Sequence, residues 1–274
     1  MSEKSFRLWS RARGWAAEIL GTFSLCLAQT EAEGERFAAL GGTLVKCLGN
    51  LKFAAAPLPY DDTALHVLRA ATTGRNVWLM ASTHRGEEAL AAPVHRELKQ
   101  NMPRLLTIIV PRHAVRGDEI AAELETFGLN IARRSKAEAI TPATDIYLAD
   151  TMGELGIFYR LAPMTALGGS FVPLGGHNPV EPAQLGSALI LGPSMFNFSE
   201  IADEFVQSHA ATQLSGTDEL GPAVKRLLTD ATERDTLAHN AQRLAEEKRH
   251  VLEAIMMELQ PLLPQTSGIQ GILP

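Results

Sequence analysis

Residues 168–182 read GGSFVPLGGHNPVEP, a short stretch that holds four glycines, three prolines, one histidine and one carboxylate. An apolar run, Met164–Leu167, precedes it and a helix-like segment, Val180–Leu185, follows it. The order is therefore strand, Gly-rich turn and helix start. At such a junction, backbone N–H groups and the positive end of the helix face any anion above the carboxyl end of the strand. The stretch predicts either a phosphate-binding turn in an α/β fold or, read alone, a simple tight turn.

The polar residues at the end of this stretch predict how the helix begins. Asn178 is expected to be the N-cap and Pro179 the first helical residue. Glu181 then lies in the first turn, beside the expected phosphate position. A carboxylate placed there suits the vicinal hydroxyls of a ribose.

Composition limits the class of protein. The chain has 274 residues, of which 46% are hydrophobic, and this length and composition fit one large or two modest soluble domains. Its net charge is −6. The acidic balance argues against nonspecific nucleic-acid binding. Cys26 and Cys47 are too few for a disulfide framework, and their apolar surroundings predict buried thiols in a reducing cytoplasm. The sequence contains no apolar run long enough to span a membrane and no signal-peptide core at its start.

Short β-like runs alternate with helical patterns along most of the chain. This alternation predicts an open parallel sheet with helices on both faces, and ligands at the carboxyl ends of its strands. The expected strands are Phe23–Ala28, Leu44–Leu48, Val77–Ala81, Leu105–Val110, Asn130–Arg133, Ile146–Leu148, Met164–Leu167 and Ala188–Leu191. The expected helices include Ala32–Leu40, Asp62–Ala71, Glu87–Gln100, Arg116–Phe127 and Glu154–Tyr159.

Two interruptions divide the pattern. Prolines and small residues in Gly49–Tyr60 predict a linker, and the 48 residues before it are too few to fold well alone. A charged run from Thr229 to Glu258 predicts a long C-terminal helix, followed by a Pro/Gly-rich tail. That helix either packs back across a domain boundary or lies on the surface of its own domain.

Four further clusters follow expected strands. Ser82 and Thr83 precede a helix and either hold an anion or only cap that helix. The Arg112-His113 pair offers cationic donors for phosphate or carboxylate, although such a pair also suits a solvated loop. The segment 150–155, DTMGEL, repeats the design of strand, glycine and helix start. In the segment 192–199, GPSMFNFS, the two phenylalanines are expected in the core rather than in a lid.

Six motifs, in this order, resemble the 3-deoxy-D-manno-octulosonic acid (Kdo) transferases, and the resemblance extends from about residue 3 to residue 260. The motifs are GNLKF (49–53), ASTHxGEE (81–88), VPRH (110–113), DTMGEL (150–155), GGSFVPxGGHNPxEP (168–182) and GPxMFNF (192–198).

The resemblance implies an α/β glycosyltransferase of the GT-B class, which has two Rossmann-like domains. It implies transfer of Kdo from CMP-Kdo to lipid IVA, a lipid A precursor, in lipopolysaccharide synthesis at the cytoplasmic face of the inner membrane. Residues 1–48 then form the last part of the N-terminal acceptor domain and 49–60 the linker. Residues 61–264 form the C-terminal donor domain, and 265–274 a tail.

The resemblance also implies which residues bind the donor. Arg112 and His113 resemble contacts to the phosphate or sugar acid, and Asn178 and Glu181 contacts to the ribose or cytidine. In the implied reaction the transition state is oxocarbenium-like and CMP leaves as an anion. The sequence has no Asp-x-Asp motif, which fits transfer without a metal or other cofactor. The full expected donor set is Ser82, Thr83, Arg112, His113, Met152, Gly153, Glu154, Gly169, Ser170, Gly176, Asn178 and Glu181.

The start of the chain departs from the family pattern. Family members begin with a hydrophobic anchor and a complete acceptor domain that carries the glutamate base, whereas Met1–Arg7 resembles an interior segment. Three hypotheses follow. The chain belongs to a working Kdo transferase, or it binds CMP-Kdo without transferring it. A UDP-sugar transferase or epimerase of the same fold is the third, which the His177-to-Glu181 context disfavours.

A basic and aromatic cluster lies near the N-terminus. Arg7, Arg11 and Arg13 occur together with Trp9 and Trp15. The cluster fits contact with an anionic membrane surface, or a solvated helix with two buried tryptophans.

Overall fold

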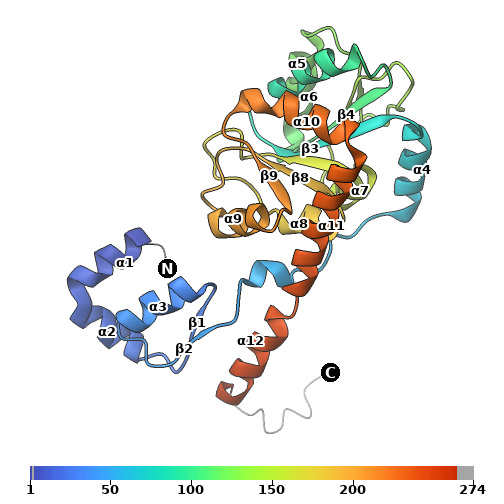
Figure 1. Cartoon of the computed structure of the whole chain (residues 1–274). Helices are drawn as coiled ribbons and strands as arrows, with labels where there is room; N and C mark the ends of the chain where they lie inside the picture. Colours follow the sequence, from blue (N-terminus) through green and yellow to red (C-terminus); the bar gives the residue numbers. More distant parts are fainter. Residues whose placement is uncertain (2, 264–274) are drawn as a thin grey trace, which may run out of the picture. The chain divides into compact units, whose positions relative to one another are not determined.

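The structure is a computed structural model that describes residues 1 and 3–263. It divides into two compact units, whose elements are labelled in Figure 1. Unit 1 comprises Met1–Ala55 with Glu247–Pro274, and unit 2 comprises Ala56–Glu246. The division falls inside the segment 49–60, where residues Leu51–Ala54 form a 3-10 helix (η2) with a buried Phe53. The expected tail, 265–274, lies outside the described residues.

Unit 1 contains a small parallel β-α-β element. Strands β1 and β2 pair in parallel, with Cys26 opposite Val45, and the helix α3 connects them. Thr30 caps α3 because its hydroxyl accepts a hydrogen bond from the N–H of Glu33. The elements are α1 (Glu3–Trp9), η1 (Ser10–Ala12), α2 (Arg13–Gly21), β1 (Cys26–Ala28), α3 (Glu31–Ala39), β2 (Val45–Cys47), η2, α12 (Val251–Leu259) and η5 (Gln260–Leu262).

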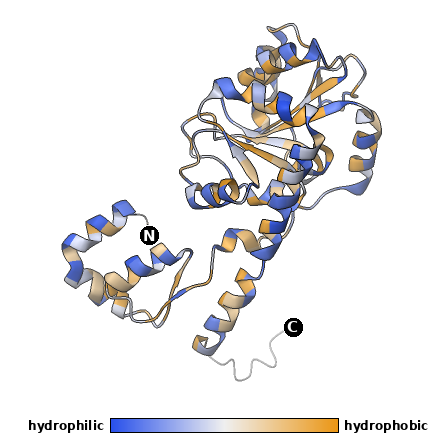
Figure 2. Cartoon of the chain, viewed as in Figure 1, coloured by the Kyte–Doolittle hydropathy of each residue, from blue (hydrophilic) through white to orange (hydrophobic). Residues whose placement is uncertain are grey.

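The expected single C-terminal helix is two helices. Helix α11 spans Ala231–Glu247, a turn follows at residues 248–250, and α12 begins at Val251. Figure 2 shows the change from a mostly hydrophilic α11 to a more hydrophobic α12. Helix α12 follows unit 2 in the chain but belongs to unit 1, where Glu258 pairs with Lys46 at 2.6 Å. Of the two alternatives, the structure therefore favours a C-terminal segment that packs back across a domain boundary.

Several side chains expected in the core of the protein are exposed. Trp9 is 39% and Trp15 74% exposed, so the expectation of two buried tryptophans is wrong. Both cysteine thiols are free and only half-buried, because their strands belong to a two-stranded sheet too small to enclose them. Phe196 in unit 2 is 63% exposed, so it too lies outside the core.

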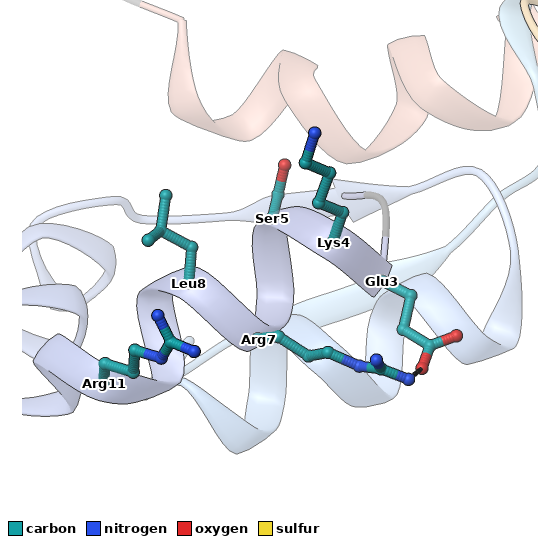
Figure 3. A pocket seen from close by; sticks show the side chains of 6 residues that line it. All are labelled: Glu3, Lys4, Ser5, Arg7, Leu8 and Arg11. Atoms are coloured by element: carbon teal, nitrogen blue, oxygen red, sulfur yellow. Dashed lines mark hydrogen bonds and ion pairs between the residues drawn. The ribbon is translucent and has the colours of Figure 1, made fainter.

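An open hollow of about 770 Å³ lies beside α1 in unit 1. Figure 3 shows its lining, in which Arg7 forms an ion pair with Glu3. The side chains come from α1 and from the adjoining η1, which continues it. The lining is Glu3, Lys4, Ser5, Arg7, Leu8 and Arg11. In the part of the chain that the structure describes, no helix has the length and hydropathy needed to cross a membrane.

Unit 2 is built on seven parallel strands in the order β5-β6-β4-β3-β7-β8-β9. Six were predicted with ends that differ by at most two residues. The seventh, β9, was missed because it is a three-residue edge strand with two polar members. The strands are β3 (Asn76–Thr83), β4 (Leu105–Pro111), β5 (Ile131–Arg133), β6 (Ile146–Leu148), β7 (Met164–Leu167), β8 (Ala188–Leu191) and β9 (Ala211–Gln213).

The sheet has a hydrophobic core on each face. Trp78 and Met80 pack with α5, α6 and α10 on one face, whereas Val77, Leu79 and Ala81 pack with α4 and α7 on the other. This alternation is the period of two that a strand imposes on its side chains. The helices of unit 2 are α4 (Asp62–Thr72), α5 (Glu88–Lys99), η3 (Ala114–Arg116), α6 (Gly117–Glu125), α7 (Leu155–Leu161), α8 (Val180–Gln184), α9 (Ser199–Gln207), η4 (Thr217–Glu219), α10 (Leu220–Thr229) and α11.

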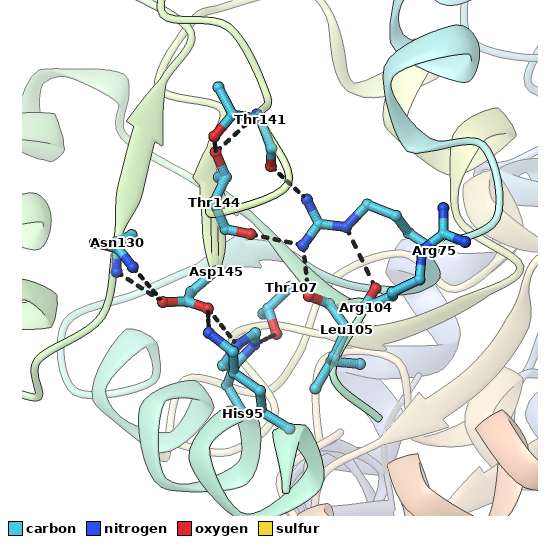
Figure 4. Close-up of polar contacts among 10 residues, drawn as sticks. Arg75, His95, Arg104, Leu105, Thr107, Asn130, Thr141, Thr144 and Asp145 are labelled. Atoms are coloured by element: carbon cyan, nitrogen blue, oxygen red, sulfur yellow. Dashed lines mark hydrogen bonds and ion pairs between the residues drawn. The ribbon is translucent and has the colours of Figure 1, made fainter. Parts of the chain in front are cut away.

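A buried polar network holds the amino ends of the central strands (Figure 4). Asp145 accepts hydrogen bonds from Asn130, His95 and Lys99, and the His95 ring also contacts the Thr107 hydroxyl at 2.8 Å. Arg75 donates to the carbonyls of Leu105 and Thr144, both at 2.6 Å. Ligands of such sheets bind at the opposite, carboxyl edge, so we interpret this network as structural.

Candidate functional site

The carboxyl ends of β3 and β7 form a topological switch point. The two strands are neighbours, but the chain continues from β3 to β4 on one side and from β7 to β8 on the other. The usual ligand site of an open parallel sheet lies above the carboxyl ends of the strands at such a point, and we refer to this place as the crevice. The loops that follow the two strands are residues 84–87 and 168–179, and the second is the Gly-rich stretch (Figure 1).

A buried carboxylate joins the two loops. Glu87 is 0% exposed, and it accepts hydrogen bonds from the N–H groups of His84 (2.8 Å), Gly169 (2.8 Å) and Phe171 (2.9 Å). Burial raises the pKa of Glu87, and the three backbone N–H groups oppose part of that rise. Glu87 therefore fixes the Gly-rich loop against the loop after β3.

The glycines of the loop have a different role from the expected one. The N–H of Gly168 donates to Ala81 O, that of Gly169 to Glu87, that of Gly175 to Ser194 Oγ and that of Gly176 to Gly169 O. The expectation that glycine N–H groups face an anion is thus wrong for these four, because the packed turn and the buried carboxylate already use them. Their function is conformational, since positive φ angles of 67° at Gly169 and 76° at Gly176 are unfavourable for other residues.

Ser170 links the Gly-rich loop to the loop after β8. Its side chain is 0% exposed, its hydroxyl donates to Leu167 O, and its Oγ accepts from the N–H of Gly192 at 2.8 Å. The carbonyl of Ser170 also accepts from the N–H of Ser194. These contacts make Ser170 a determinant of loop shape.

Ser82 and Thr83 lie at an irregular strand end. The register of β3 against β4 shifts between Ala81 and Thr83, and Ser82 has a left-handed φ of 58°. A non-glycine residue held there costs about 1–3 kcal/mol and is typical of functional sites. The Thr83 hydroxyl donates to the buried Glu88 carboxylate at 2.9 Å, and Arg116 binds the same carboxylate at 2.7 Å. Thr83 is 0% exposed, so its hydroxyl is part of this internal cluster.

Three histidines from three loops meet at the crevice. The Nε2 atoms of His84 and His177 lie 2.9 Å apart, and their rings are nearly parallel, at 8°. The ring of His113 lies edge-on to His84, with 5.8 Å between the ring centres. Burial, together with the nearby His84, Arg112 and His113, lowers the pKa of His177 to about 4. Burial also lowers the pKa of His84. Both half-buried histidines are therefore neutral at pH 7.

The exposed partners in this cluster are Arg112 and His113. Both follow β4, and the Arg112 N–H donates to Thr83 O at 2.9 Å, which ties the two strand ends together. Their exposed side chains leave the guanidinium and imidazole accessible to a ligand in the crevice. The sequence-based expectation that these two residues reach the site is consistent with this position.

Asn178 and Glu181 lie where the Gly-rich loop enters α8. The helix begins at Val180, one residue later than expected, and Asn178 Oδ1 accepts from the Val180 N–H at 3.2 Å. Burial raises the pKa of Glu181, while a hydrogen bond with Asn178 and the charge of Arg112 lower it. Glu181 is half-buried and electrostatically coupled to both Arg112 and Tyr159. A half-buried carboxylate with an amide neighbour is suited to accept hydrogen bonds from sugar hydroxyls.

A third loop, after β6, supplies the remaining expected residues. Met152 is 67% exposed, and Gly153 has a positive φ of 82°. Glu154 is held by Arg134 through two hydrogen bonds of 2.6 and 3.1 Å, which lower the pKa of Glu154. Gly153 and Glu154 line a cleft of about 350 Å³, together with Pro59, Tyr60, Asp61 and Ile157.

Sequence reasoning missed the residues that hold the site together. His84, Glu87 and Glu88 lie inside the ASTHxGEE motif. The two adjacent carboxylates after an expected strand could have indicated that these residues take part in the site. Arg134, in contrast, gave no signal, because its partner Glu154 is 20 positions away and no spacing rule links them.

Comparison with known proteins shows which family this chain resembles. Residues 1–55 match the family described as 3-deoxy-D-manno-octulosonic-acid transferase (kdotransferase). The 3-deoxy-D-manno-octulosonic acid transferase of Haemophilus influenzae is 32% identical over 270 residues, which cover 96% of this chain and 62% of that protein. The chain spans about three-fifths of the length of the curated relatives it matches.

Solved structures are also similar to this chain. The C-terminal CMP-Kdo binding domain of WaaA from Acinetobacter baumannii matches with a TM-score of 0.62 and 32% identity, covering 66% of this chain and 94% of that domain. Anabaena HepE, solved with UDP, matches with a TM-score of 0.55 and 17% identity, covering 96% of this chain and 68% of that protein. At 17% identity the second match shows only a common fold.

Proposed function

This chain belongs to the 3-deoxy-D-manno-octulosonic acid transferase family, and we propose that unit 2 binds CMP-Kdo in the crevice between β3 and β7. The predicted fold class is confirmed, since the α/β architecture with a seven-stranded parallel sheet is that of a GT-B C-terminal domain. In this proposal the protein transfers Kdo from CMP-Kdo to a lipid A precursor, lipid IVA, in lipopolysaccharide synthesis. Its place of action is the cytoplasmic face of the inner membrane.

One observation carries the proposal. The chain covers 94% of a domain solved as a CMP-Kdo binding domain, at 32% identity. The residues expected to bind the donor also converge on the carboxyl edge of one sheet, although they come from loops up to 99 positions apart, from Ser82 to Glu181. Ligands of this fold class bind at that edge.

The residues of the crevice have separate roles in the proposal. Arg112 and His113 contact the phosphate or the Kdo carboxylate, since both side chains are exposed and carry donors. Asn178 and Glu181 hold the ribose or the cytidine. Ser82 lies beside the phosphate, whereas Thr83 positions Glu88 and Arg116.

The remaining predicted residues shape or line the site. Met152, Gly153 and Glu154 form a wall on the side of β6. Gly169, Ser170 and Gly176 set the course of the Gly-rich loop.

The chemistry requires stabilisation of a leaving anion. Cleavage of the bond between Kdo and the phosphate passes through an oxocarbenium-like transition state and leaves negative charge on CMP. A guanidinium fixed at the strand edge stabilises that charge as it develops, without reorganising at the moment of reaction. Arg112 fits this role because its backbone is tied to Thr83 while its side chain is exposed.

The test combines binding with transfer. Calorimetric titration of the chain with CMP is expected to show one site per chain, and Arg112→Met is expected to weaken it. A transfer assay with CMP-Kdo and lipid IVA then separates the two functional hypotheses. Binding with transfer supports a working transferase, and binding without transfer supports a donor-binding module. Absence of CMP binding would contradict both.

A further inference from the structure

The contact between His84 and His177 restricts where this pair can carry hydrogens. Both rings face each other through Nε2, at 2.9 Å, so one hydrogen lies between the two Nε2 atoms. In the neutral pair, one Nδ1 then carries a hydrogen and the other is a bare acceptor. A bare acceptor repels a phosphate oxygen.

One added proton changes what the pair presents to a ligand. It can be placed on the bare Nδ1 without disturbing the Nε2 contact, after which both Nδ1 atoms are donors. A second added proton would place two hydrogens between the Nε2 atoms and break the contact. The pair is therefore suited to one positive charge.

The surroundings of the pair determine when it is charged. Burial lowers the pKa of both rings, so the pair alone is neutral near pH 7. An anion in the crevice would reverse that balance, because an opposite charge favours the protonated form. The groups around the pair are His113 and Arg112 after β4, Arg116 in η3, Glu88 in α5 and the Ser82 backbone. Of these, the cationic groups and His113 oppose protonation, whereas Glu88 and the hydrogen bond with the Ser82 backbone favour it.

We propose that the His84–His177 pair is a proton-binding part of the donor site, which takes up one proton from solvent when a phosphodiester anion binds. The inference rests on the proposed function and adds a ligand contact and a pH dependence to it. The proton comes from bulk water, and no covalent bond is made or broken in this step. The crevice thus gains positive charge only when the anion is present.

The probe that tests this is the methyl ester of cytidine 5′-phosphate. Its phosphate is a diester, so the probe itself does not titrate near neutral pH. Calorimetry at about pH 6 in two buffers of different ionisation enthalpy is expected to show net uptake approaching one proton per site. Between pH 7.5 and pH 6 the affinity is expected to rise about fivefold to tenfold, because binding coupled to one proton gains up to tenfold per pH unit.

Variants separate the pair from the rest of the protein. His84→Gln and His177→Gln are expected to abolish proton uptake, while His66→Gln, on the exposed surface of α4, leaves it unchanged. NMR titration of the histidine rings in the unsubstituted protein does not depend on whether the variants fold. It is expected to show the pKa of one ring of the pair rising when the ester binds.

The outcomes distinguish the two proposals. Binding of the ester without proton uptake, or binding of CMP but not of the ester, overturns the role of the histidine pair and leaves the proposed function standing. Failure of both CMP and the ester to bind at any pH overturns the proposed function and this inference together.

Discussion

The buried carboxylate of Glu87 accepts a hydrogen bond of 2.8 Å from the N–H of Gly169, 82 positions further along the chain. The same carboxylate accepts from the N–H groups of His84 and Phe171, so one side chain sets the distance between the loops after β3 and β7. The shape of the crevice thus depends on a residue that is fully buried and has no access to a ligand.

Glu87→Gln is expected to lower both the free energy of unfolding and the affinity for CMP. A glutamine has one acceptor oxygen and an NH2 group, which would face a backbone N–H. Loss of a buried, charge-assisted acceptor costs about 1–3 kcal/mol. Urea unfolding and CMP titration measure the two effects. Glu97→Gln, an exposed change on α5, the helix that follows Glu87, is the matched control, and equal behaviour of the two variants would contradict the role of Glu87.

Gly168→Ala tests the close approach of the same two loops. A Cβ at Gly168 would lie 2.5 Å from Ser82 O and 2.8 Å from Ala81 O, and these backbone atoms cannot rotate away. Overpacking of this kind costs about 1–3 kcal/mol. Thermal unfolding is the measurement.

Gly221→Ala provides the comparison, because its Cβ would meet only Val94 at an ordinary 3.5 Å and the residue is helical. That change is expected to be neutral or stabilising. A Gly168→Ala protein as stable as Gly221→Ala would refute the close contact.

The sequence predicted the sheet well because strand periodicity is local information. The runs 146–148, 164–167 and 188–191 were predicted with the bounds that the structure shows, since each is short, apolar and bounded by turn residues. It predicted β9 not at all, because Ala211–Gln213 has no such signature. The break between α11 and α12 was also missed, since a charged run continues the helical pattern through it.

The site was predicted less completely than the sheet. Strand-end position identified Arg112, Asn178 and Glu181 as neighbours in space. The contacts among Glu87, Gly169 and the His84–His177 pair depend on which strands are adjacent, and that order is decided by long-range pairing. Glycine was expected to bind an anion through its N–H, but the N–H groups are used inside the protein and the positive φ angles are what the loop requires.

Unfolding at different pH values tests the neutral state of the half-buried His177. The pKa of His177 is lowered to about 4 in the folded protein, against about 6.5 when unfolded. The unfolded chain therefore binds more protons between these values, and stability must fall as the pH falls from about 6.5 towards 4. His177→Gln is expected to flatten this part of the profile. An unchanged profile in the variant would show that His177 is not buried in its neutral form.

The proposed contact between Glu181 and the ribose can be tested with a nucleotide that lacks one ribose hydroxyl. If its carboxylate accepts from a ribose hydroxyl, CMP is expected to bind about tenfold more tightly than 2′-deoxy-CMP, since a hydrogen bond to a charged group contributes about 1.5–3 kcal/mol. Glu181→Ala is expected to remove most of that preference. Calorimetry of both nucleotides with both proteins completes the cycle. A preference that survives in Glu181→Ala would assign ribose recognition to another residue.

The most direct test of the central claim is a crystal structure of the chain with CMP. The account predicts the nucleotide at the carboxyl ends of β3 and β7, with its phosphate near Arg112 and its ribose near Glu181. A nucleotide bound elsewhere on unit 2, or a crevice that stays empty at saturating CMP, would contradict it.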